Sequence, residues 1–337
     1  MTIKLLVVDD SAFMRKIISD TIKEVDGVEV VGIARNGSDA LEVIPKLQPD
    51  IITLDIEMPK LNGIETLKRI KEDFRIPVIM LSSNNKSYVT IEALELGALD
   101  FIEKPVDLTA NLFEFRNELE LKIKSVYNAK AYAEKNLNDD LCCSKSKCND
   151  VKAVVIGAST GGPRALVYIV SRLPEKIKLP IFITQHMPKG FTSSLAERMD
   201  NESKISVVEA SDGMVINKNT VYLAPGDLHM YLEGDKIRLN SNAKLHGVRP
   251  AVDYLFKTAA EKYQRNLLGI ILTGMGKDGS DGMVAIKDHG GYNIAQSQES
   301  CVVYGMPGSA VSKGVVDEIL DLESISTRLN QLVRVSI

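Results

Sequence analysis

The chain has 337 residues, of which 45% are hydrophobic and 26% charged, with a formal net charge of -4. This balance is typical of a globular protein with two domains, and the lack of a basic stripe or a DNA-reading module argues against nucleic acid as a partner. The apolar run at residues 5–8 is short and no run approaches the length of a membrane span, so we expect neither a signal peptide nor membrane insertion. Four cysteines in a chain of this size are typical of thiols in a reducing compartment, and we expect a cytoplasmic protein.

Residues 1 to about 125 alternate short apolar strands with amphipathic helices such as Phe13 to Glu24. This alternation predicts a doubly wound, flavodoxin-like (βα)5 domain with a parallel sheet covered on both faces. The predicted strands are Ile3 to Val8, Val28 to Ala34, Ile51 to Asp55, Pro77 to Ser82 and Asp100 to Glu103.

Five polar side chains fall at the carboxyl ends of these strands, where ligands bind in such sheets: Asp9, Asp10, Asp55, Ser82 and Lys104. Carboxylates forced together repel one another unless a divalent cation neutralises them, so the sequence predicts a Mg²⁺ site. Asp55 ends its strand and can attack a phosphoryl donor as a carboxylate nucleophile, while Lys104 and Ser82 would hold the phosphoryl oxygens. Helix capping by Asp10 or Ser11 is the structural alternative, but it accounts for only one of the five residues.

The segments that carry these residues read Val7-Val8-Asp9-Asp10-Ser11, Leu54-Asp55-Ile56-Glu57-Met58-Pro59 and Lys104-Pro105, together with Ser82. Over the whole first domain the chain thereby resembles the receiver domain of bacterial two-component response regulators. The resemblance implies that Asp55 accepts phosphate from a histidine kinase. It also implies that Mg²⁺ is carried by Asp9, Asp10, Asp55 and Glu57, and that the switch sensing phosphorylation consists of Ser82, Phe101 and Lys104.

The connection between the domains is polar. The pattern is helical from Leu112 to about Lys135, and residues 136–150 lack periodicity, so we predict an interdomain linker at residues 126–150 that imposes little fixed geometry. Cys142, Cys143 and Cys148 lie in this segment. Zinc binding is an alternative for them, but no fourth ligand is near in sequence, and we interpret them as linker thiols.

Strands and helices alternate again over residues 151–337 and predict a second doubly wound, mainly parallel α/β domain. Besides an apolar run at residues 153–156, the clear strands are Pro180 to His186, Ile205 to Glu209 and Leu268 to Thr273. Residues 220–239 are instead short extended pieces with a turn at Pro225-Gly226-Asp227, which predicts a short antiparallel hairpin.

The first strand of this domain ends in Gly157-Ala158-Ser159-Thr160-Gly161-Gly162, and Pro163 then suits the first turn of a helix. The G-x-S-x-G spacing places a serine hydroxyl on a sharp turn beside backbone N–H groups that can hold an oxyanion, so Ser159 is a candidate nucleophile. Glycine and serine also form ordinary turns and phosphate loops, so the motif needs partners to carry the interpretation.

Two further residues can complete a catalytic group. His186 ends a strand on the same edge as Ser159 and is the candidate base, and Asp278 follows a buried strand and is the candidate partner of that base. The competitors for these roles are His229, His246 and His289 for the base, and Asp212 and Asp281 for the carboxylate.

A rival interpretation is dinucleotide binding. Gly274, Gly276 and Gly279 match the G-x-G-x-x-G fingerprint after a strand, and Glu299 lies 20 residues beyond Gly279. Against it, Asp278 would stand close to a pyrophosphate, and the fingerprint comes late in the domain. A receiver fused to a dinucleotide-dependent enzyme and a receiver with a purely binding output are therefore the alternatives to an enzyme with a serine nucleophile.

Three segments follow the receiver in order: Gly157-Ala158-Ser159-Thr160-Gly161-Gly162, Gln185-His186-Met187-Pro188 and Leu272-Thr273-Gly274-Met275-Gly276-Lys277-Asp278-Gly279. With them, nearly the entire chain resembles the chemotaxis protein-glutamate methylesterase family. The resemblance implies Ser159 as nucleophile, His186 as base and Asp278 as its partner, with Thr160 and the backbone of Met275 beside the oxyanion site.

The same resemblance implies a reaction and its control. The substrates would be glutamate γ-methyl esters and selected glutamines of methyl-accepting chemotaxis receptors, and no cofactor would be needed in the second domain. The phosphodonor would be the chemotaxis histidine kinase. The unphosphorylated receiver would block the active site, and phosphorylation at Asp55 would relieve the block.

Overall fold

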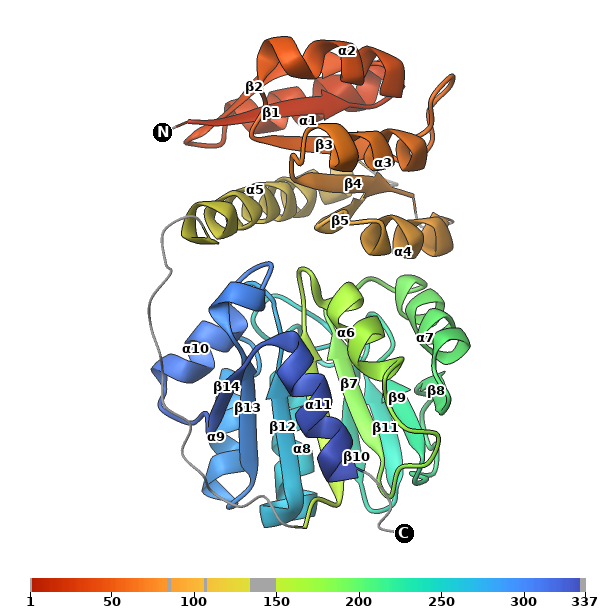
Figure 1. Cartoon of the computed structure of the whole chain (residues 1–337), viewed down its shortest axis with the longest axis vertical. Helices are drawn as coiled ribbons and strands as arrows, with labels where there is room; N and C mark the ends of the chain where they lie inside the picture. Colours follow the sequence, from red (N-terminus) through yellow and green to blue (C-terminus); the bar gives the residue numbers. More distant parts are fainter. Residues whose placement is uncertain (1, 84–85, 106–107, 134–149, 334–337) are drawn as a thin grey trace. The chain divides into compact units, whose positions relative to one another are not determined.

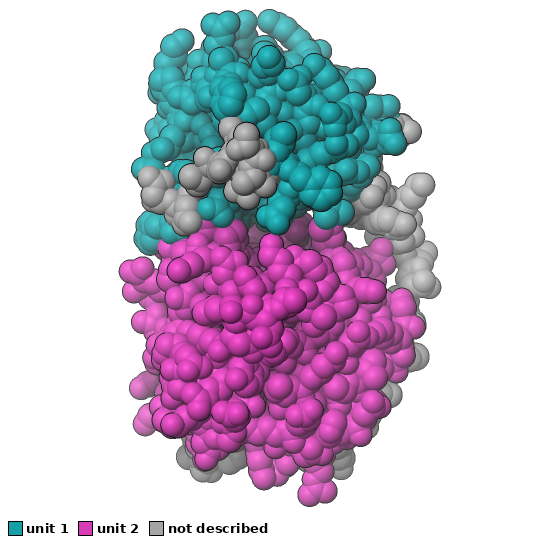
Figure 2. Space-filling view, turned by 180° about the vertical axis from the view of Figure 1, so that it is seen from behind, with its two compact units in different colours: residues 1–135 teal, residues 136–337 magenta. Residues whose placement is uncertain are grey.

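The computed structural model describes residues 2–83, 86–105, 108–133 and 150–333. The chain divides into two compact units, residues 1–135 and 136–337, which Figure 2 colours separately. The linker at residues 126–150 remains a prediction, because most of it, with Cys142, Cys143 and Cys148, lies outside the described residues.

The first unit is a five-stranded parallel sheet in the order β2-β1-β3-β4-β5, which confirms the predicted fold (Figure 1). Its strands are β1 (Ile3–Val8), β2 (Val28–Ala34), β3 (Ile51–Asp55), β4 (Val78–Ser82) and β5 (Asp100–Glu103). Its helices are α1 (Ala12–Lys23), α2 (Gly37–Leu47), α3 (Gly63–Asp73), α4 (Ser87–Glu95) and α5 (Leu108–Ala133). The middle strand, β3, is buried along its whole length, so its last residue, Asp55, is placed at the centre of the carboxyl edge.

Short polar side chains fix where the first three helices begin. The Ser11 hydroxyl accepts a hydrogen bond from the Met14 N–H, and Asn36 and Asn62 cap α2 and α3 in the same way. Ser11 is therefore a helix cap, as the structural alternative for this segment expected. Helices α1 and α5 share one apolar cluster with the sheet, to which α1 contributes Ile18 and α5 contributes Leu119.

The second unit is a seven-stranded parallel sheet in the order β14-β13-β12-β6-β7-β9-β8, with a separate antiparallel pair, β10-β11. The strands of the main sheet are β6 (Ala153–Ala158), β7 (Ile181–Gln185), β8 (Ser206–Glu209), β9 (Thr220–Leu223), β12 (Leu267–Ile271), β13 (Tyr292–Gln296) and β14 (Glu318–Leu320). Its α-helices are α6 (Gly162–Val170), α7 (Phe191–Glu202), α8 (Val252–Tyr263), α9 (Ser280–Asp288), α10 (Met306–Ser312) and α11 (Leu322–Val333).

The predicted hairpin is present, and its position differs from the sequence pattern. The antiparallel strands are β10 (His229–Glu233) and β11 (Lys236–Asn240), joined at Gly234 and Asp235. The first extended piece of the segment, β9, instead pairs in parallel with β7 and β8. The turn at Gly226 and Asp227 therefore connects the main sheet to the hairpin and does not join the two hairpin strands.

The chain enters the main sheet at its middle. It begins with β6, runs outward through β7 to β9 and β8, and returns after the hairpin to place β12 on the other side of β6 (Figure 1). Strands β6, β7 and β12 are buried throughout. The direction of winding thus changes between β6 and β12, and the carboxyl ends of strands at such a point form the usual ligand site of a doubly wound sheet.

Candidate functional sites

Three carboxylates meet at the carboxyl edge of the first sheet. Asp9 and Asp55 are buried and Asp10 is exposed, and one oxygen from each lies within 4.8 Å of the other two. The Lys104 Nζ, at the end of β5, lies 2.8 Å from Asp9 Oδ2 and 2.7 Å from Asp55 Oδ2. The structure thus brings the predicted carboxylates together with the ammonium group of Lys104.

Burial and the neighbouring charges shift the pKa values of this cluster. Burial raises the pKa of Asp55 to about 6, and Asp9 adds to the rise while the Lys104 ammonium opposes it. Burial alone would lower the pKa of Lys104, but the two carboxylates outweigh it, and the pKa lies above its ordinary value. Three carboxylates against one ammonium leave negative charge in a partly buried place, and carboxylate oxygens are the ligands that Mg²⁺ prefers, so the donor set fits that ion.

The side chain of Glu57 stands apart from this cluster, although its backbone N–H lies 3.4 Å from Asp55 Oδ1. Its exposed carboxylate lies 2.7 Å from the Lys86 Nζ, and it does not join the three aspartates. Both residues line a pocket of about 580 Å³ beside the cluster, to which Asp10, Met58, Pro59 and Asn62 also contribute.

The two remaining receiver residues are buried on neighbouring strands. The Ser82 hydroxyl lies 2.6 Å from Thr90 Oγ1 of α4 and 3.2 Å from the Ser83 carbonyl oxygen, so its described partners are on the α4 side. The Phe101 ring is buried, and the Lys122 Nζ of α5 lies 5.3 Å from its centroid. Neither of these described hydrogen bonds of the Ser82 hydroxyl reaches Asp55.

In the second unit, Ser159 follows β6 on a turn that only glycines permit. Gly161 has φ 77°, and a Cβ there would come within 2.6 Å of Val302. On the other side, a Cβ on Gly274 would come within 2.8 Å of the Ser159 Cβ. The Ser159 N–H donates to the Thr273 carbonyl oxygen at 3.0 Å, so the turn is anchored to the segment that follows β12.

His186 directly follows the last residue of β7, beside this turn. Ala158 and Gln185 are paired in register, and the His186 N–H donates to the Ala158 carbonyl oxygen at 3.1 Å, so Ser159 and His186 each follow a residue of one paired row. The His186 Nε2 lies 2.7 Å from Asp278 Oδ2. Among the described residues, no hydrogen bond joins Ser159 Oγ to His186, and the described side-chain partner of the His186 ring is Asp278.

Asp278 is buried and held from two sides. Its carboxylate accepts hydrogen bonds from the backbone N–H groups of Val252 (2.7 Å) and Asp253 (2.9 Å), at the start of α8, in addition to His186. Burial acts against the charged form, but His186 and these two N–H groups outweigh it and hold the pKa of Asp278 below its ordinary value. A carboxylate with this pKa stays ionised at neutral pH.

Thr160 and Met275 lie on the two segments that flank Ser159. Thr160 is buried, and its carbonyl oxygen accepts a hydrogen bond from Thr273 Oγ1 at 2.9 Å. Met275 follows Gly274 in the loop after β12. Their part in an oxyanion site remains a prediction.

The competing residues have partners of their own. His229 is buried, and its Nδ1 accepts a hydrogen bond from the Ala251 N–H at 3.2 Å. Asp212 binds Arg238 and the Leu239 N–H, and the His289 Nδ1 lies 2.8 Å from the Ala285 carbonyl oxygen.

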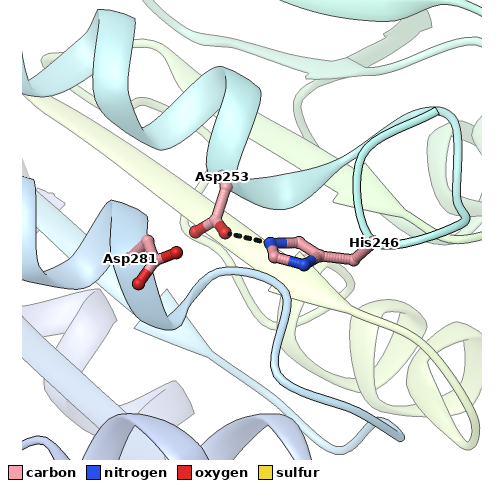
Figure 3. A group of neighbouring side chains, drawn as sticks. All are labelled: His246, Asp253 and Asp281. Atoms are coloured by element: carbon pink, nitrogen blue, oxygen red, sulfur yellow. Dashed lines mark hydrogen bonds and ion pairs between the residues drawn. The ribbon is translucent and has the colours of Figure 1, made fainter. Parts of the chain in front are cut away.

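His246, Asp253 and Asp281 form a neighbouring group (Figure 3). The buried Asp253 lies between the other two in Figure 3; it accepts hydrogen bonds from His246 Nε2 at 2.9 Å and from the Gly282 N–H at 2.6 Å. Asp281 forms an ion pair with Lys313. These contacts assign His246 to the support of Asp253, which the sequence reasoning did not identify.

Another residue that sequence reasoning missed as a functional group is Gln185. It appears in the sequence motif with His186, but its amide contacts both proposed catalytic segments: Nε2 lies 3.0 Å from the Ser159 carbonyl oxygen and 3.1 Å from that of His186. A long amide side chain at the end of a short strand that begins Ile181-Phe182-Ile183 is the sequence signal that could have identified it.

The loop of the dinucleotide fingerprint is used differently from a phosphate site. Asp278, inside the loop, points its carboxylate to His186 and to the start of α8. The N–H of Gly282, in the first turn of α9, already donates to Asp253. A pyrophosphate would need such N–H groups at this helix end, so the geometry disfavours nicotinamide binding.

Comparisons with known proteins cover both units. Residues 154–329 match the family described as CheB methylesterase, and residues 5–114 match the response regulator receiver domain. A protein-glutamate methylesterase/protein-glutamine glutaminase of Pyrococcus abyssi is 44% identical, covering 96% of this chain and 91% of its own length. Its counterpart in Thermotoga maritima is 44% identical and covers 98% of both chains.

A solved structure matches the second unit. The crystal structure of the Thermotoga maritima CheB methylesterase catalytic domain has a TM-score of 0.53 and 46% identity, covering 55% of this chain and all of its own. In the part of the chain that the structure describes, no helix combines the length and hydropathy of a membrane span. The chain therefore belongs to the CheB methylesterase family, with a response regulator receiver domain ahead of its methylesterase domain.

Proposed function

We propose that this protein is a phosphorylation-regulated serine hydrolase acting on methyl-accepting chemotaxis receptors. It hydrolyses glutamate γ-methyl esters to release methanol and deamidates selected glutamines, and so mediates sensory adaptation. The observation that carries the proposal is the hydrogen bond of 2.7 Å between His186 and the ionised Asp278, beside the sharp turn that bears Ser159. The names of the relatives agree with this activity.

The contacts of His186 determine which nitrogen acts as the base. Asp278 is ionised and can only accept, so the proton of the neutral imidazole resides on Nε2 and the lone pair on Nδ1. Nδ1 takes the proton of Ser159 as Oγ attacks the ester carbonyl, and Asp278 stabilises the imidazolium that forms. Backbone N–H groups near Thr160 and Met275 stabilise the oxyanion.

The acyl-enzyme then forms and breaks by the same proton movements. His186 returns its proton to the leaving methoxide oxygen, so methanol departs and the glutamyl group stays on Ser159 Oγ. A water molecule, deprotonated by His186, attacks this ester and frees the glutamate. With glutamine as substrate the leaving group is ammonia, and the remaining steps are unchanged.

The receiver supplies the control. Asp55 accepts the phosphoryl group from the chemotaxis histidine kinase, and Asp9, Asp10 and Asp55 would hold Mg²⁺, which neutralises charge on the transferred group. The Glu57 carboxylate would join only by leaving its ion pair with Lys86. The new dianion at Asp55 draws Lys104 and Ser82 toward it, and the face around Phe101 repacks.

The unphosphorylated receiver blocks the active site, and phosphorylation relieves the block. The reaction takes place in the cytoplasm, on the helical bundle of the receptors.

The deciding experiment measures methanol release from methylated receptor membranes, with and without phosphodonor, for the intact protein and Ser159→Ala. Release that rises with phosphodonor and vanishes in the variant supports the esterase activity of Ser159 and its control by phosphorylation. If the intact protein is inert on receptors from its own organism, a binding output becomes the better interpretation.

Removal of residues 1–150 tests the block separately. The truncated protein should release methanol faster than the unphosphorylated intact protein, because its active site is open without phosphodonor. An unchanged basal rate would argue against occlusion while leaving the esterase activity itself intact.

A further inference from the structure

One buried amide links the backbones of the two residues that exchange a proton in the proposed reaction. Gln185 is 2% exposed, and its Nε2 lies 3.0 Å from the carbonyl oxygen of Ser159 and 3.1 Å from that of His186. Both partners can only accept hydrogen bonds, so the NH₂ end of the amide faces them and both of its protons are used.

This amide lies at the point where the backbone hydrogen bonds between β6 and β7 end. The hydrogen bond from the His186 N–H to the Ala158 carbonyl oxygen is the last described backbone bond between the ends of β6 and β7. Beyond it, the Ser159 N–H turns to Thr273, on the other side. The Gln185 side chain therefore continues the connection by one more step, across the two residues that must face each other.

The surroundings of the other end of the amide argue against a mere packing role. Gln185 Oε1 is buried without a hydrogen-bond partner, and a Cβ on Gly162 would come within 2.1 Å of it. A buried polar atom without a partner destabilises the fold, so an apolar side chain would fill this space more favourably. The two hydrogen bonds made by Nε2 are what an apolar side chain could not supply.

We infer that Gln185 is a positioning residue that sets the separation and orientation of Ser159 and His186 by holding their two carbonyl groups. The inference rests on the proposed function of these two residues. Gln185 is enclosed and acts through Ser159 and His186, so it affects the attack on the ester carbonyl and leaves receptor binding unchanged.

The test uses the full-length protein and two variants of nearly the same shape. Gln185→Met removes both donors, and Gln185→Glu replaces them by a carboxyl group that can donate one hydrogen bond only when it is protonated. Thr184→Val is the matched control, since Thr184 is buried on the same strand and its hydroxyl has no hydrogen-bond partner. Methanol release, the labelling rate of Ser159 by a fluorophosphonate, and thermal unfolding are measured for each.

Gln185→Met should lower kcat and the labelling rate by about tenfold or more, with KM within about twofold of the unmodified protein, because misplaced reacting groups slow the chemical step. For Gln185→Glu, activity relative to the unmodified protein should rise as the pH falls, because the protonated acid regains one donor. Thr184→Val should match the unmodified protein in both rates.

Two results would overturn the inference and leave the proposed function standing. One is an active unmodified protein together with a Gln185→Met variant of equal kcat. The other, decisive even where Gln185→Met fails to fold, is a Gln185→Glu variant whose relative activity does not change with pH. An unmodified protein that neither labels at Ser159 nor releases methanol would overturn the proposed function, and the inference with it.

Discussion

Asp253 and Asp278 cap each other's helices. Asp278, in the loop leading into α9, accepts the N–H groups of Val252 and Asp253 at the start of α8. Asp253, in the first turn of α8, accepts the Gly282 N–H of α9 at 2.6 Å. Burial and the nearby Asp278 raise the pKa of Asp253, and hydrogen bonds from Gly282 and His246 oppose the rise. Asp278 thus ties the loop before α9 to the start of α8 as well as orienting His186.

This double role predicts different outcomes for two similar substitutions. Asp278→Asn should lower the methanol release rate by about 10²–10⁴-fold, because His186 loses the charge that stabilises its protonated form. Asp253→Asn should retain most activity, since its carboxylate does not contact His186. Each should lower the free energy of unfolding by about 1–3 kcal/mol, as measured in urea, because the amide NH₂ group cannot accept the buried hydrogen bonds that the replaced carboxylate oxygen accepted. Equal losses of activity would mean that the helix junction, and not the charge of Asp278, limits catalysis.

Asp55→Asn should not be labelled by acetyl phosphate and should show no rise in methanol release with phosphodonor. Its basal esterase rate should persist, since the second unit is unaltered. Asp73→Asn, at an exposed position near the end of α3, removes the same charge and is the control. Labelling that remains in Asp55→Asn would show that another residue accepts the phosphoryl group.

Thr90→Val should make the receiver easier to activate. The Ser82 hydroxyl is bound to Thr90 Oγ1 at 2.6 Å, and freeing it lowers the cost of its movement toward Asp55 by about 1 kcal/mol. The acetyl phosphate concentration for half-maximal stimulation of methanol release should then fall about fivefold.

Thr66→Val is a close control for that change. Thr66 is also buried, and its hydroxyl donates to the carbonyl oxygen four residues earlier, as the Thr90 hydroxyl does. It has no contact with Ser82 among its described hydrogen bonds. A Thr90→Val response equal to that of Thr66→Val would exclude a specific effect on Ser82.

His229 should make the free energy of unfolding of the second unit depend on pH. Burial lowers its pKa, and its Nδ1 must stay unprotonated to accept the Ala251 N–H. An unfolded chain binds a proton at this residue below a pH of about 6.5, whereas the folded chain resists it, so the free energy of unfolding falls as the pH falls through that value.

Urea unfolding at pH 7.5 and 5.5 measures this effect. His229→Phe is the comparison, because its ring can still stack on Tyr254. From pH 7.5 to 5.5 the free energy of unfolding should fall further in the unmodified protein than in this variant, and the difference should be at most about 1.4 kcal/mol. Equal losses would mean that His229 titrates alike in both states.

Local pattern was sufficient for the first sheet. Four of its five predicted strands have the observed bounds and the fifth differs by one residue at Pro77, because short buried strands read as apolar runs between helices. In each sheet the ends of the apolar runs also predicted which residues lie at the carboxyl edge, Asp55 in the first and Ser159 and His186 in the second, since parallel strands bring their carboxyl ends to one edge.

The remainder depends on contacts between distant segments. Strand β13 (Tyr292–Gln296) contains Asn293 and ends in Gln296, and β14 has three half-buried residues, so neither was among the predicted strands. Nothing local in the sequence of β9 distinguishes its parallel partners from a hairpin partner. The support of Asp278 by α8, and of Asp253 by His246, joins segments whose meeting depends on the whole sheet.

Because the direction of winding reverses in the second sheet, the proposed catalytic residues come from two successive parts of the chain. Ser159 and His186 belong to the part of the chain that ends with β11, whereas Asp278 and the N–H groups of α8 that hold it belong to the part that follows. A break in the loop at residues 241–251 would leave each fragment with an incomplete site. Ester hydrolysis would return only when the two fragments dock across β6 and β12, so activity itself would report the joining of the two halves.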